Sequence, residues 1–381
     1  MAGRARILID FVDAHNVGHV VEALRYAAGH RAANPDAHIG LVLNAASPSE
    51  MATWAGTVDE VFTIPLYEGV EAMAGAAAGI PAEWDYVLDD LRRTNPVQLD
   101  VVPGFADWWP IADAHFEAAE HRGYCGIPPQ PPGYVPHQTV RLDLPAAARA
   151  SAGDLVPGGS PRIAVVPAGS SARETYPSAA AWTDVIGAIT DRWPDAVVAL
   201  IGKTAADGRT TTQVSGDEHA ALAGLPGVVD VFDRPLAEQL AVVEGCDAFL
   251  STHTGFGLAA LAVATPWVCI AGGAWPEYFF NGVPFRSVMP PAAFGSFSLY
   301  EPVPTVEDDE GEGRRQLHVT RGRIREDTTA ILDAIEALAA GQVGYDEAVA
   351  DHFRRLSDVL GDRADQIFSI DMVHLRHLPA S

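Results

Sequence analysis

The segment CDAFLSTHTGFGLAALAVATP (residues 246–266) decides the fold, because a tight turn in it joins a short apolar run to an apolar helical pattern. The run up to Thr252 predicts a buried strand, and HTGFG (253–257) then opens a helix. Free N–H groups at such a helix start form a ready phosphate site, and Gly255 lets a ligand approach the backbone closely. The pattern is equally compatible with an ordinary strand-to-helix turn.

Strand-like and helix-like runs alternate along most of the chain. Continuous apolar strands separated by helices indicate parallel sheets covered on both faces. Two stretches interrupt the alternation: the proline-rich GIPPQPPGYVPH (126–137) and VPGGSP (156–161), which we interpret as a domain hinge. The runs that predict strands are 5–12, 38–45, 60–66, 84–91, 162–168, 195–202, 227–232, 246–252 and 266–272.

These patterns predict an α/β protein with two doubly wound, Rossmann-like domains that face a cleft. We expect an N-terminal domain over residues 1–156 and a second domain over 157–330. Helical patterns within 331–381 could pack back on the N-terminal domain. In such folds ligands bind beyond the carboxyl ends of the strands, so the loops after each strand are the candidate site.

The composition excludes several classes of protein. Acidic residues outnumber basic ones 50 to 25, and the resulting net charge of −25 argues against nucleic-acid binding. No apolar stretch approaches the roughly 18 residues of a membrane span, and no signal peptide is evident, so we expect a soluble cytoplasmic protein. Cys125, Cys246 and Cys269 lack metal or disulfide spacing, and the last two lie in apolar runs that predict core positions.

Several segments, taken in order, resemble the family-nine, heptosyltransferase-like glycosyltransferases of the GT-B fold. HTGFGLAALAVATP (253–266) is the most specific, because its spacing from Gly255 to Pro266 matches the family's Thr-Gly to Thr-Pro signature. The similarities cover most of residues 5–275. The weaker ones are ARILIDFVDAHNVGHVVEAL (5–24), EWDYVLDDLRRT (83–94), RIAVVPAGSSARETYPSAAAWTDVIGAI (162–189) and GVVDVFDRPLAEQLAVVEGCDAFLS (227–251).

The resemblance implies that the second domain holds a nucleoside-diphosphate sugar with neither a metal nor a further cofactor. Helix N-termini and a few cations would then stabilise the diphosphate. Taken singly, Arg173 and Lys203 are equally well explained as solvated loop cations. The implied donor contacts are Gly169, Ser170, Ser171, Arg173, Lys203, Asp207, His253, Thr254, Gly255 and Phe256.

The catalytic position departs from the family pattern. Where relatives carry Gly followed by an acidic base, this chain has Gly18 and His19. An imidazole in the first turn of a helix is a sensible general base, because the helix dipole disfavours its protonated form. Asp13 could orient or replace His19, and His19 could instead be a packing residue. His253 and Glu174 also replace the family's Asp and Lys.

Candidate acceptor contacts lie in the first domain. VVPGFADWWPIADAHF (101–116) gathers Asp107, Trp108 and Trp109 with Phe105 and Asp113, and aromatic faces beside carboxylates often hold sugars. The same stretch could fold its aromatic side chains into the core. His15 is a further candidate, and Trp275 and Glu277 could lie near the donor sugar.

We therefore expect a metal-independent, inverting glycosyltransferase. It would transfer a sugar from a nucleoside-diphosphate donor to a small-molecule or glycosidic acceptor, in secondary metabolism. Its partners would be these two substrates, with no nucleic acid and no membrane span. Two alternatives stay open: a GT-B sugar-nucleotide epimerase or hydrolase, and a catalytically silent protein that binds nucleotide sugars.

Overall fold

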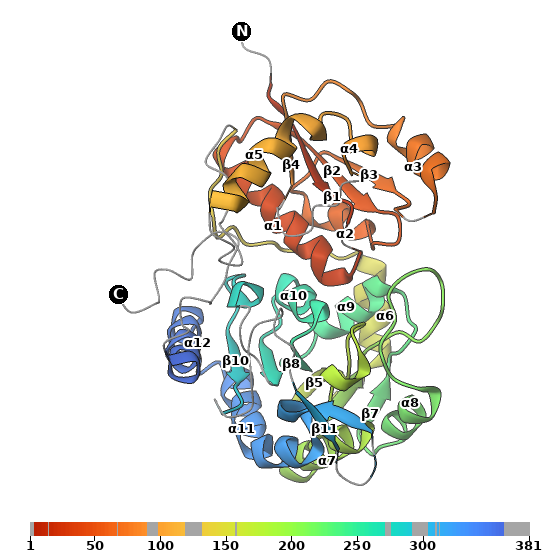
Figure 1. Cartoon of the computed structure of the whole chain (residues 1–381). Helices are drawn as coiled ribbons and strands as arrows, with labels where there is room; N and C mark the ends of the chain where they lie inside the picture. Colours follow the sequence, from red (N-terminus) through yellow and green to blue (C-terminus); the bar gives the residue numbers. More distant parts are fainter. Residues whose placement is uncertain are drawn as a thin grey trace. The chain divides into compact units, whose positions relative to one another are not determined.

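The computed structural model shows two compact units, one ending at Asp143 and the next beginning at Leu144 (Figure 1). Each unit is built around its own sheet. Among the described residues, no helix is both long and apolar enough to cross a membrane. The described residues are 4–13, 15–66, 68–89, 98–118, 132–156, 158–270, 276–291, 304–308, 311 and 313–361.

The first unit contains a parallel four-stranded sheet in the order β3-β2-β1-β4. Strand β1 lies inside it and is buried on both faces, with Ile7, Leu8 and Ile9 fully inaccessible to solvent. This burial explains the uninterrupted apolar run in the sequence. The strands are β1 (Arg6–Phe11), β2 (His38–Asn44), β3 (Glu60–Ile64) and β4 (Tyr86–Asp89), and the helices are α1 (Val17–Ala33), α2 (Glu50–Ala55), α3 (Val70–Ala77), α4 (Gln98–Val101) and α5 (Phe105–Ala118).

The second unit contains a parallel six-stranded sheet in the order β10-β9-β8-β5-β6-β7. Its strands are β5 (Arg162–Val166), β6 (Val197–Leu200), β7 (Val228–Asp230), β8 (Ala248–Thr252), β9 (Trp267–Ile270) and β10 (Phe285–Val288). Its α-helices are α6 (Ala146–Leu155), α7 (Ala179–Arg192), α8 (Gly216–Ala223), α9 (Leu236–Glu244), α10 (Gly255–Ala262), α11 (Arg321–Ala339) and α12 (Tyr345–Leu360). A small hairpin, β11 (Thr305–Glu307) with β12 (Arg314–Gln316), and the 3-10 turns η1 (Arg173–Thr175) and η2 (Pro276–Phe279) complete the elements used below.

The strand order creates one topological switch point in each sheet. In the first unit the chain runs from β1 through β2 to β3, and β4 then pairs on the other side of β1. In the second unit the chain runs from β5 through β6 to β7, and β8 then pairs on the other side of β5. Loops diverge at such a point and leave room for a ligand, so the loops after β1, β5 and β8 are the favoured places.

The structure confirms all nine predicted strands, each to within a few residues. It adds β10, whose sequence FRSV is too short and polar to stand out. It also adds α5, which forms although Pro110 lies inside it. The C-terminal helical patterns are confirmed as α11 and α12.

The units divide earlier than the VPGGSP stretch, because α6 packs on the second unit. Helix α6 lies against α9, and Arg149 forms a bidentate ion pair with Glu244 at 2.7 and 2.9 Å. Residues 144–155 therefore join the second unit, whereas the sequence places them in the first.

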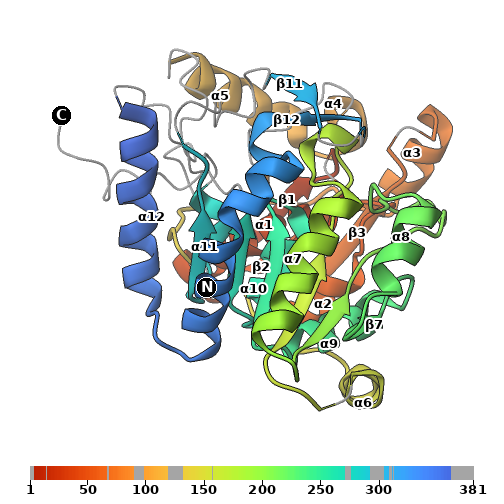
Figure 2. The ribbon, with the colours of Figure 1, turned by 90° about the horizontal axis from the view of Figure 1, so that it is seen from below.

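The C-terminal helices α11 and α12 pack within the second unit. Figure 2 shows α11 beside α7, where Arg321 binds Asp184 at 2.7 Å. Helix α12 packs on β10, where Arg286 binds Glu347 at 2.8 Å. Both helices therefore belong to the second unit.

The two described cysteines are core residues, as predicted. Cys246 and Cys269 are buried as free thiols. Burial raises the pKa of Cys246 to about 12 and that of Cys269 well above its usual range. Both thiols therefore stay protonated and unreactive at neutral pH. Cys125 lies outside the described residues.

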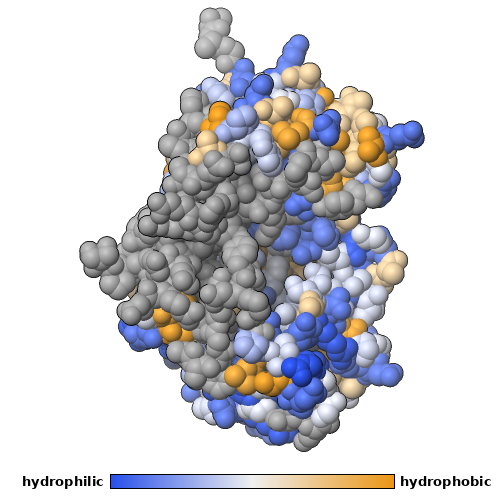
Figure 3. Space-filling model, viewed as in Figure 1, coloured by the Kyte–Doolittle hydropathy of each residue, from blue (hydrophilic) through white to orange (hydrophobic). Residues whose placement is uncertain are grey.

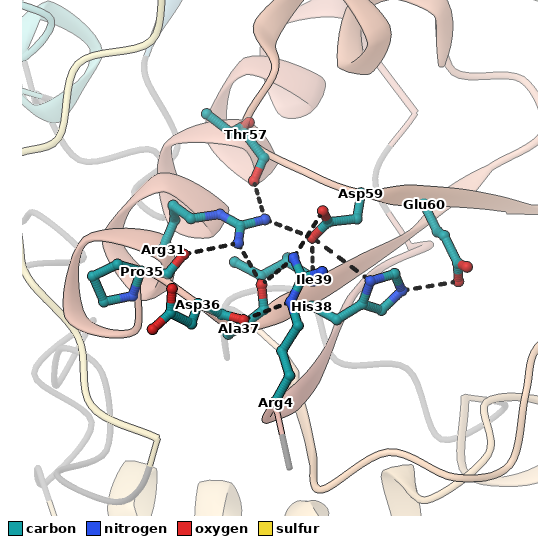
Figure 4. Close-up of polar contacts among 10 residues, drawn as sticks. All are labelled: Arg4, Arg31, Pro35, Asp36, Ala37, His38, Ile39, Thr57, Asp59 and Glu60. Atoms are coloured by element: carbon teal, nitrogen blue, oxygen red, sulfur yellow. Dashed lines mark hydrogen bonds and ion pairs between the residues drawn. The ribbon is translucent and has the colours of Figure 1, made fainter.

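The carboxylate of Asp59 connects several segments at the amino edge of the first sheet through hydrogen bonds (Figure 4). Asp59 accepts hydrogen bonds from Arg31 at 2.6 Å, from Arg4 at 3.1 Å and from the Ile39 N–H at 2.8 Å. Partial burial would raise the pKa of Asp59, but these donors outweigh it and lower the pKa to about 2. The cluster lies at the edge opposite the ligand-binding ends of the strands, so we assign it a structural role.

The exposed surface is unevenly polar. In the view of Figure 3, apolar residues gather over α3 in the first unit, and Val70 on that helix is 74% exposed. The second unit presents a largely hydrophilic face in the same view.

Candidate functional site

The switch point of the second unit brings two predicted donor loops into contact. Gly169, after β5, lies so close to Thr254 and Tyr176 that a Cβ atom there would be 3.4 Å from Thr254 Cγ2 and 2.6 Å from Tyr176 Oη. Tyr176 Oη in turn accepts a hydrogen bond from the Ser171 N–H at 3.0 Å. The phenol therefore fixes the loop that carries Gly169, Ser170 and Ser171 beside the start of α10.

Helix α10 starts at Gly255, as the HTGFG turn predicts. Its N-cap, Thr254, has an extended backbone and makes no side-chain cap, so the first backbone N–H groups are not covered by that side chain. Thr254 is buried, with Oγ1 3.4 Å from Ser251 Oγ. Its hydroxyl therefore lies inside the unit, and the ligand-binding capacity of this turn resides in the backbone and the helix dipole.

Aromatic side chains hold His253 at this turn. Its ring packs against Tyr278 at a centroid distance of 4.5 Å and is stacked on Phe279 at 5.7 Å with an interplanar angle of 10°. Trp267 lies beneath the start of α10, and a Cβ at Gly257 would approach its ring to 2.3 Å. The two glycines of HTGFG thus differ in role. Gly255 begins the helix, whereas Gly257 leaves space for the Trp267 ring, which a Cβ atom would fill.

The predicted donor cations each have an acidic partner. Arg173 forms an ion pair with Glu218, which also completes a capping box with Ser215 at the start of α8. Lys203 pairs with Asp207, and this hydrogen bond lowers the pKa of Asp207. A nucleotide phosphate would have to compete with these carboxylates for the two cations. Arg173, Lys203 and Asp207 therefore remain only predicted donor contacts.

Asp233, which follows β7 in the second sheet, is a structural residue that sequence reasoning missed. Its carboxylate accepts hydrogen bonds from the Thr204 and Ala205 N–H groups at 2.7 and 2.8 Å and from Thr204 Oγ1 at 2.6 Å. It therefore holds the loop after β6 to the end of β7. The φ of 59° at Asp233 lies in the left-handed region, which aspartate adopts more readily than most residues. The available sequence signal was an aspartate directly after the predicted strand 227–232.

The switch point of the first unit contains a buried carboxylate pair that the sequence did not predict. Asp10 on β1 and Asp89 on β4 are register partners and are almost completely inaccessible to solvent. Gln98 Nε2 donates to Asp10 Oδ2 at 2.7 Å and to Asp89 Oδ2 at 3.1 Å. Asp10 Oδ1 also accepts from the Val12 N–H at 3.1 Å, which fixes the chain as it enters the β1–α1 loop.

The predicted catalytic residues lie at this loop and the helix that follows. His15 is exposed and Asp13 half-buried. His19 lies in the first turn of α1, with its side chain 19% exposed. Its Nε2 atom is 4.0 Å from Glu22 Oε2, one turn further along the helix. The carboxylate that the structure places beside His19 is therefore Glu22, which the sequence reading did not single out.

The structure corrects one acceptor prediction. Trp108 is only 4% exposed and packs against Phe105, so it is a core residue of the first unit. This is the alternative that the sequence left open for the aromatic stretch. Asp107 is exposed and Trp109 half-buried, so both stay predictions. Trp275 and the side chains of Asp113 and Glu277 lie outside the described residues.

Comparison with known proteins identifies the architecture. No family model and no curated protein matches the sequence. Among solved structures, the glycosyl transferase family 9 protein of Veillonella parvula matches with a TM-score of 0.61 at 13% identity, over 90% of this chain and 99% of that one. The chain has the GT-B fold.

Two further GT-B structures support this assignment. The E. coli heptosyltransferase WaaC, solved with ADP, matches with a TM-score of 0.55 at 15% identity, over 86% of this chain and 99% of that one. The E. coli ADP-heptose lipopolysaccharide heptosyltransferase II matches with a TM-score of 0.52 at 17% identity, over 87% of this chain and all of that one. The resemblance read from the sequence is thus confirmed for the fold and extends over nearly the whole chain.

Proposed function

We propose that this protein is a glycosyltransferase that takes a sugar from a nucleoside-diphosphate donor. The observation that carries the proposal is the switch point of the second unit, where the Gly169 loop lies against the uncapped start of α10. A helix N-terminus beside a glycine-containing loop is well suited to a diphosphate. The GT-B neighbours, which include one solved with ADP, support this use of the fold.

The donor half of the reaction belongs to the second unit. As the bond between sugar and phosphate breaks, negative charge grows on the leaving diphosphate. The backbone N–H groups of Gly255 and Phe256 and the dipole of α10 would stabilise that charge. Since this stabilisation needs no divalent ion, we propose a metal-independent reaction. Turnover that is equal in EDTA and in Mg²⁺ would agree with it, and a strict requirement for a metal would refute it.

The acceptor half belongs to the β1–α1 corner of the first unit. His19 is the proposed general base, with Asp13 and His15 as its neighbours in the chain. Removal of a proton from the acceptor hydroxyl allows that oxygen to displace the diphosphate directly, which inverts the anomeric configuration. We propose a small-molecule or glycosidic acceptor, and an acidic protein with a net charge of −25 would favour a cationic one.

Calorimetry with ADP, GDP and UDP, followed by their sugars, tests the donor site. We expect one diphosphate to bind at micromolar Kd and Gly169→Ala to weaken it at least tenfold, because the new Cβ displaces Tyr176 or Thr254. Gly153→Ala on α6 is the matched control, because the new Cβ would have no atom of the described residues within 4 Å. Absence of binding by all three nucleotides would refute the proposal.

Turnover separates a transferase from its alternatives. With a bound donor sugar and a panel of hydroxylated acceptors, we expect a glycosylated product, and His19→Ala should lower kcat by about 10²–10⁴ with little effect on donor Kd. Release of free sugar without an acceptor would indicate a hydrolase, and conversion of the donor sugar an epimerase. Tight binding without any turnover would indicate a silent binding protein.

A further inference from the structure

Glu22 is a buried acid on the apolar face of α1. The residue is 7% exposed, and its helix neighbours Val20, Val21, Ala23 and Leu24 are all buried. A carboxylate in such a position costs considerable solvation energy unless an opposite charge or hydrogen-bond donors compensate it. The imidazole of His19, three residues earlier, is an ionisable partner on the same helix face.

The orientation of His19 gives its two ring nitrogens different surroundings. Nδ1 is buried, whereas Nε2 faces Glu22 Oε2 at 4.0 Å. That separation is longer than a hydrogen bond, so the two groups interact as charges or through a bridging water. The nitrogen assigned to proton transfer is therefore Nε2.

The carboxylate opposes the effect of the helix terminus on His19. The start of α1 carries about half an elementary positive charge, which disfavours an imidazolium in the first turn. An ionised Glu22 would place a negative charge 4.0 Å from Nε2, and because its side chain is only 5% exposed, solvent screens that charge weakly. Such a charge would stabilise the imidazolium that forms when His19 accepts a proton.

We propose that Glu22 is the positioning residue of the catalytic base, an inference that rests on the proposed function. During transfer the acceptor O–H bond breaks and its proton moves to His19 Nε2. The acceptor oxygen bonds to the anomeric carbon, and the electron pair of the broken sugar–phosphate bond leaves with the diphosphate. Glu22 stays ionised and stabilises the imidazolium by its charge, so the proton does not pass on to it.

A double-mutant cycle tests this role. Glu22→Gln should lower kcat about 10–100-fold while the KM for the donor stays within about twofold. In the His19→Ala background the same change should alter kcat less than about twofold, because no base remains to be assisted. Glu22→Asp should restore part of the activity. Equal losses in both backgrounds would show that Glu22 serves folding alone and would overturn the proposal.

Glu71→Gln is the matched control. Glu71 lies exposed on α3, also in the first unit, and should leave kcat and KM unchanged. Thermal unfolding of each variant should accompany the kinetics, so that a loss of folded protein is counted separately.

NMR titration of the His19 ring gives a readout that does not depend on turnover. Removing the negative charge in Glu22→Gln should move the midpoint of its titration to lower pH. The same measurement on Glu71→Gln should give the wild-type curve. The other ionisable groups that α1 and its neighbours carry near this end stay unchanged in both variants: Asp10, Asp13 and His15 from β1 and its loop, Arg25 on α1 and Glu50 on α2.

The two proposals fail in different ways. An unchanged His19 titration in Glu22→Gln would overturn the pairing even if sugar transfer is found. Absence of transfer with every donor would overturn the proposed function and with it the catalytic role of Glu22, whether or not the titration responds.

Discussion

Asp10 and Asp89 are paired across the switch point of the first unit and share the amide of one residue, Gln98. The two N–H bonds of a single Nε2 atom serve two buried carboxylates on neighbouring strands. This arrangement links β1, β4 and α4 directly before the β1–α1 loop, and the proposed base His19 lies in the first turn of the helix that follows. Its contribution to the free energy of unfolding depends on a neutral donor between two buried carboxylates, and it can be measured without any substrate.

Gln98→Glu should destabilise the protein strongly. The change replaces a shared donor by a third buried carboxyl group, which removes two hydrogen bonds and adds a group that repels its neighbours. We expect a loss of about 3–5 kcal/mol in the free energy of unfolding, measured by urea denaturation. Gln342→Glu, at an exposed position after α11, should change it by less than about 0.5 kcal/mol. Similar values for both variants would show that the bridge contributes nothing.

Two glycine-to-alanine changes should have opposite signs. At Gly257 the new Cβ would lie 2.3 Å from the Trp267 ring, so the fully buried indole must move, at a cost of about 1–3 kcal/mol. At Gly187, inside α7, a Cβ would have no atom within 4 Å in the part of the chain that the structure describes, so alanine should stabilise the helix by about 0.5–1 kcal/mol. Chemical denaturation of both variants checks the prediction, and a neutral Gly257→Ala would contradict the packing argument.

Asp59→Asn should weaken the amino edge of the first sheet at neutral pH. The folded-state pKa is lowered to about 2, so this stabilisation is present above the unfolded value of 3.8 and is lost as the pH falls toward 2. Since the side chain is 29% exposed, we expect a loss of only about 1–2 kcal/mol at pH 7. Asp36→Asn, at an exposed position nearby, should be within about 0.5 kcal/mol of wild type. Equal effects of the two changes would exclude the proposed role.

Acid should unfold the protein well above the pKa values of its carboxylates. Burial lowers the pKa of His30 and His318 to about 4 and that of His352 to about 3, so each stays neutral when folded. The unfolded chain binds a proton at each below about pH 6.5, and every such histidine then costs about 1.4 kcal/mol per pH unit. We expect stability to be maximal near neutral pH and to fall steeply between pH 6.5 and 4.

His352→Leu isolates one of these histidines. Both ring nitrogens of His352 are buried and have no hydrogen-bond partner among the described residues. Leucine should therefore leave stability at pH 7 unchanged or raise it by about 1 kcal/mol. The loss of stability with acid should become shallower, because one proton fewer is taken up on unfolding. His15→Leu, at an exposed position, should leave the slope unchanged. An unaltered slope in His352→Leu would contradict the assignment.

The sequence by itself determined the element types and the two-sheet design. Alternating apolar runs and helical spacings report which face of each segment is buried, and burial is a local property of the pattern. The HTGFG turn predicted where α10 starts for the same reason, since glycine, a capping residue and an apolar run are adjacent in the chain. The resemblance to family-nine enzymes depended on these ordered local signals, so it could be read before the structure.

Only the tertiary structure decided which side chains meet. Gln98 and Asp10 are 88 positions apart, and they come together because β4 pairs with β1 on the side opposite β2. The pairing of Arg173 with Glu218 and the packing of α6 on α9 likewise depend on strand order and helix placement. No local periodicity encodes the strand order, because that order is set by how all the elements pack together. The partners of the predicted site residues are therefore visible only in the folded chain.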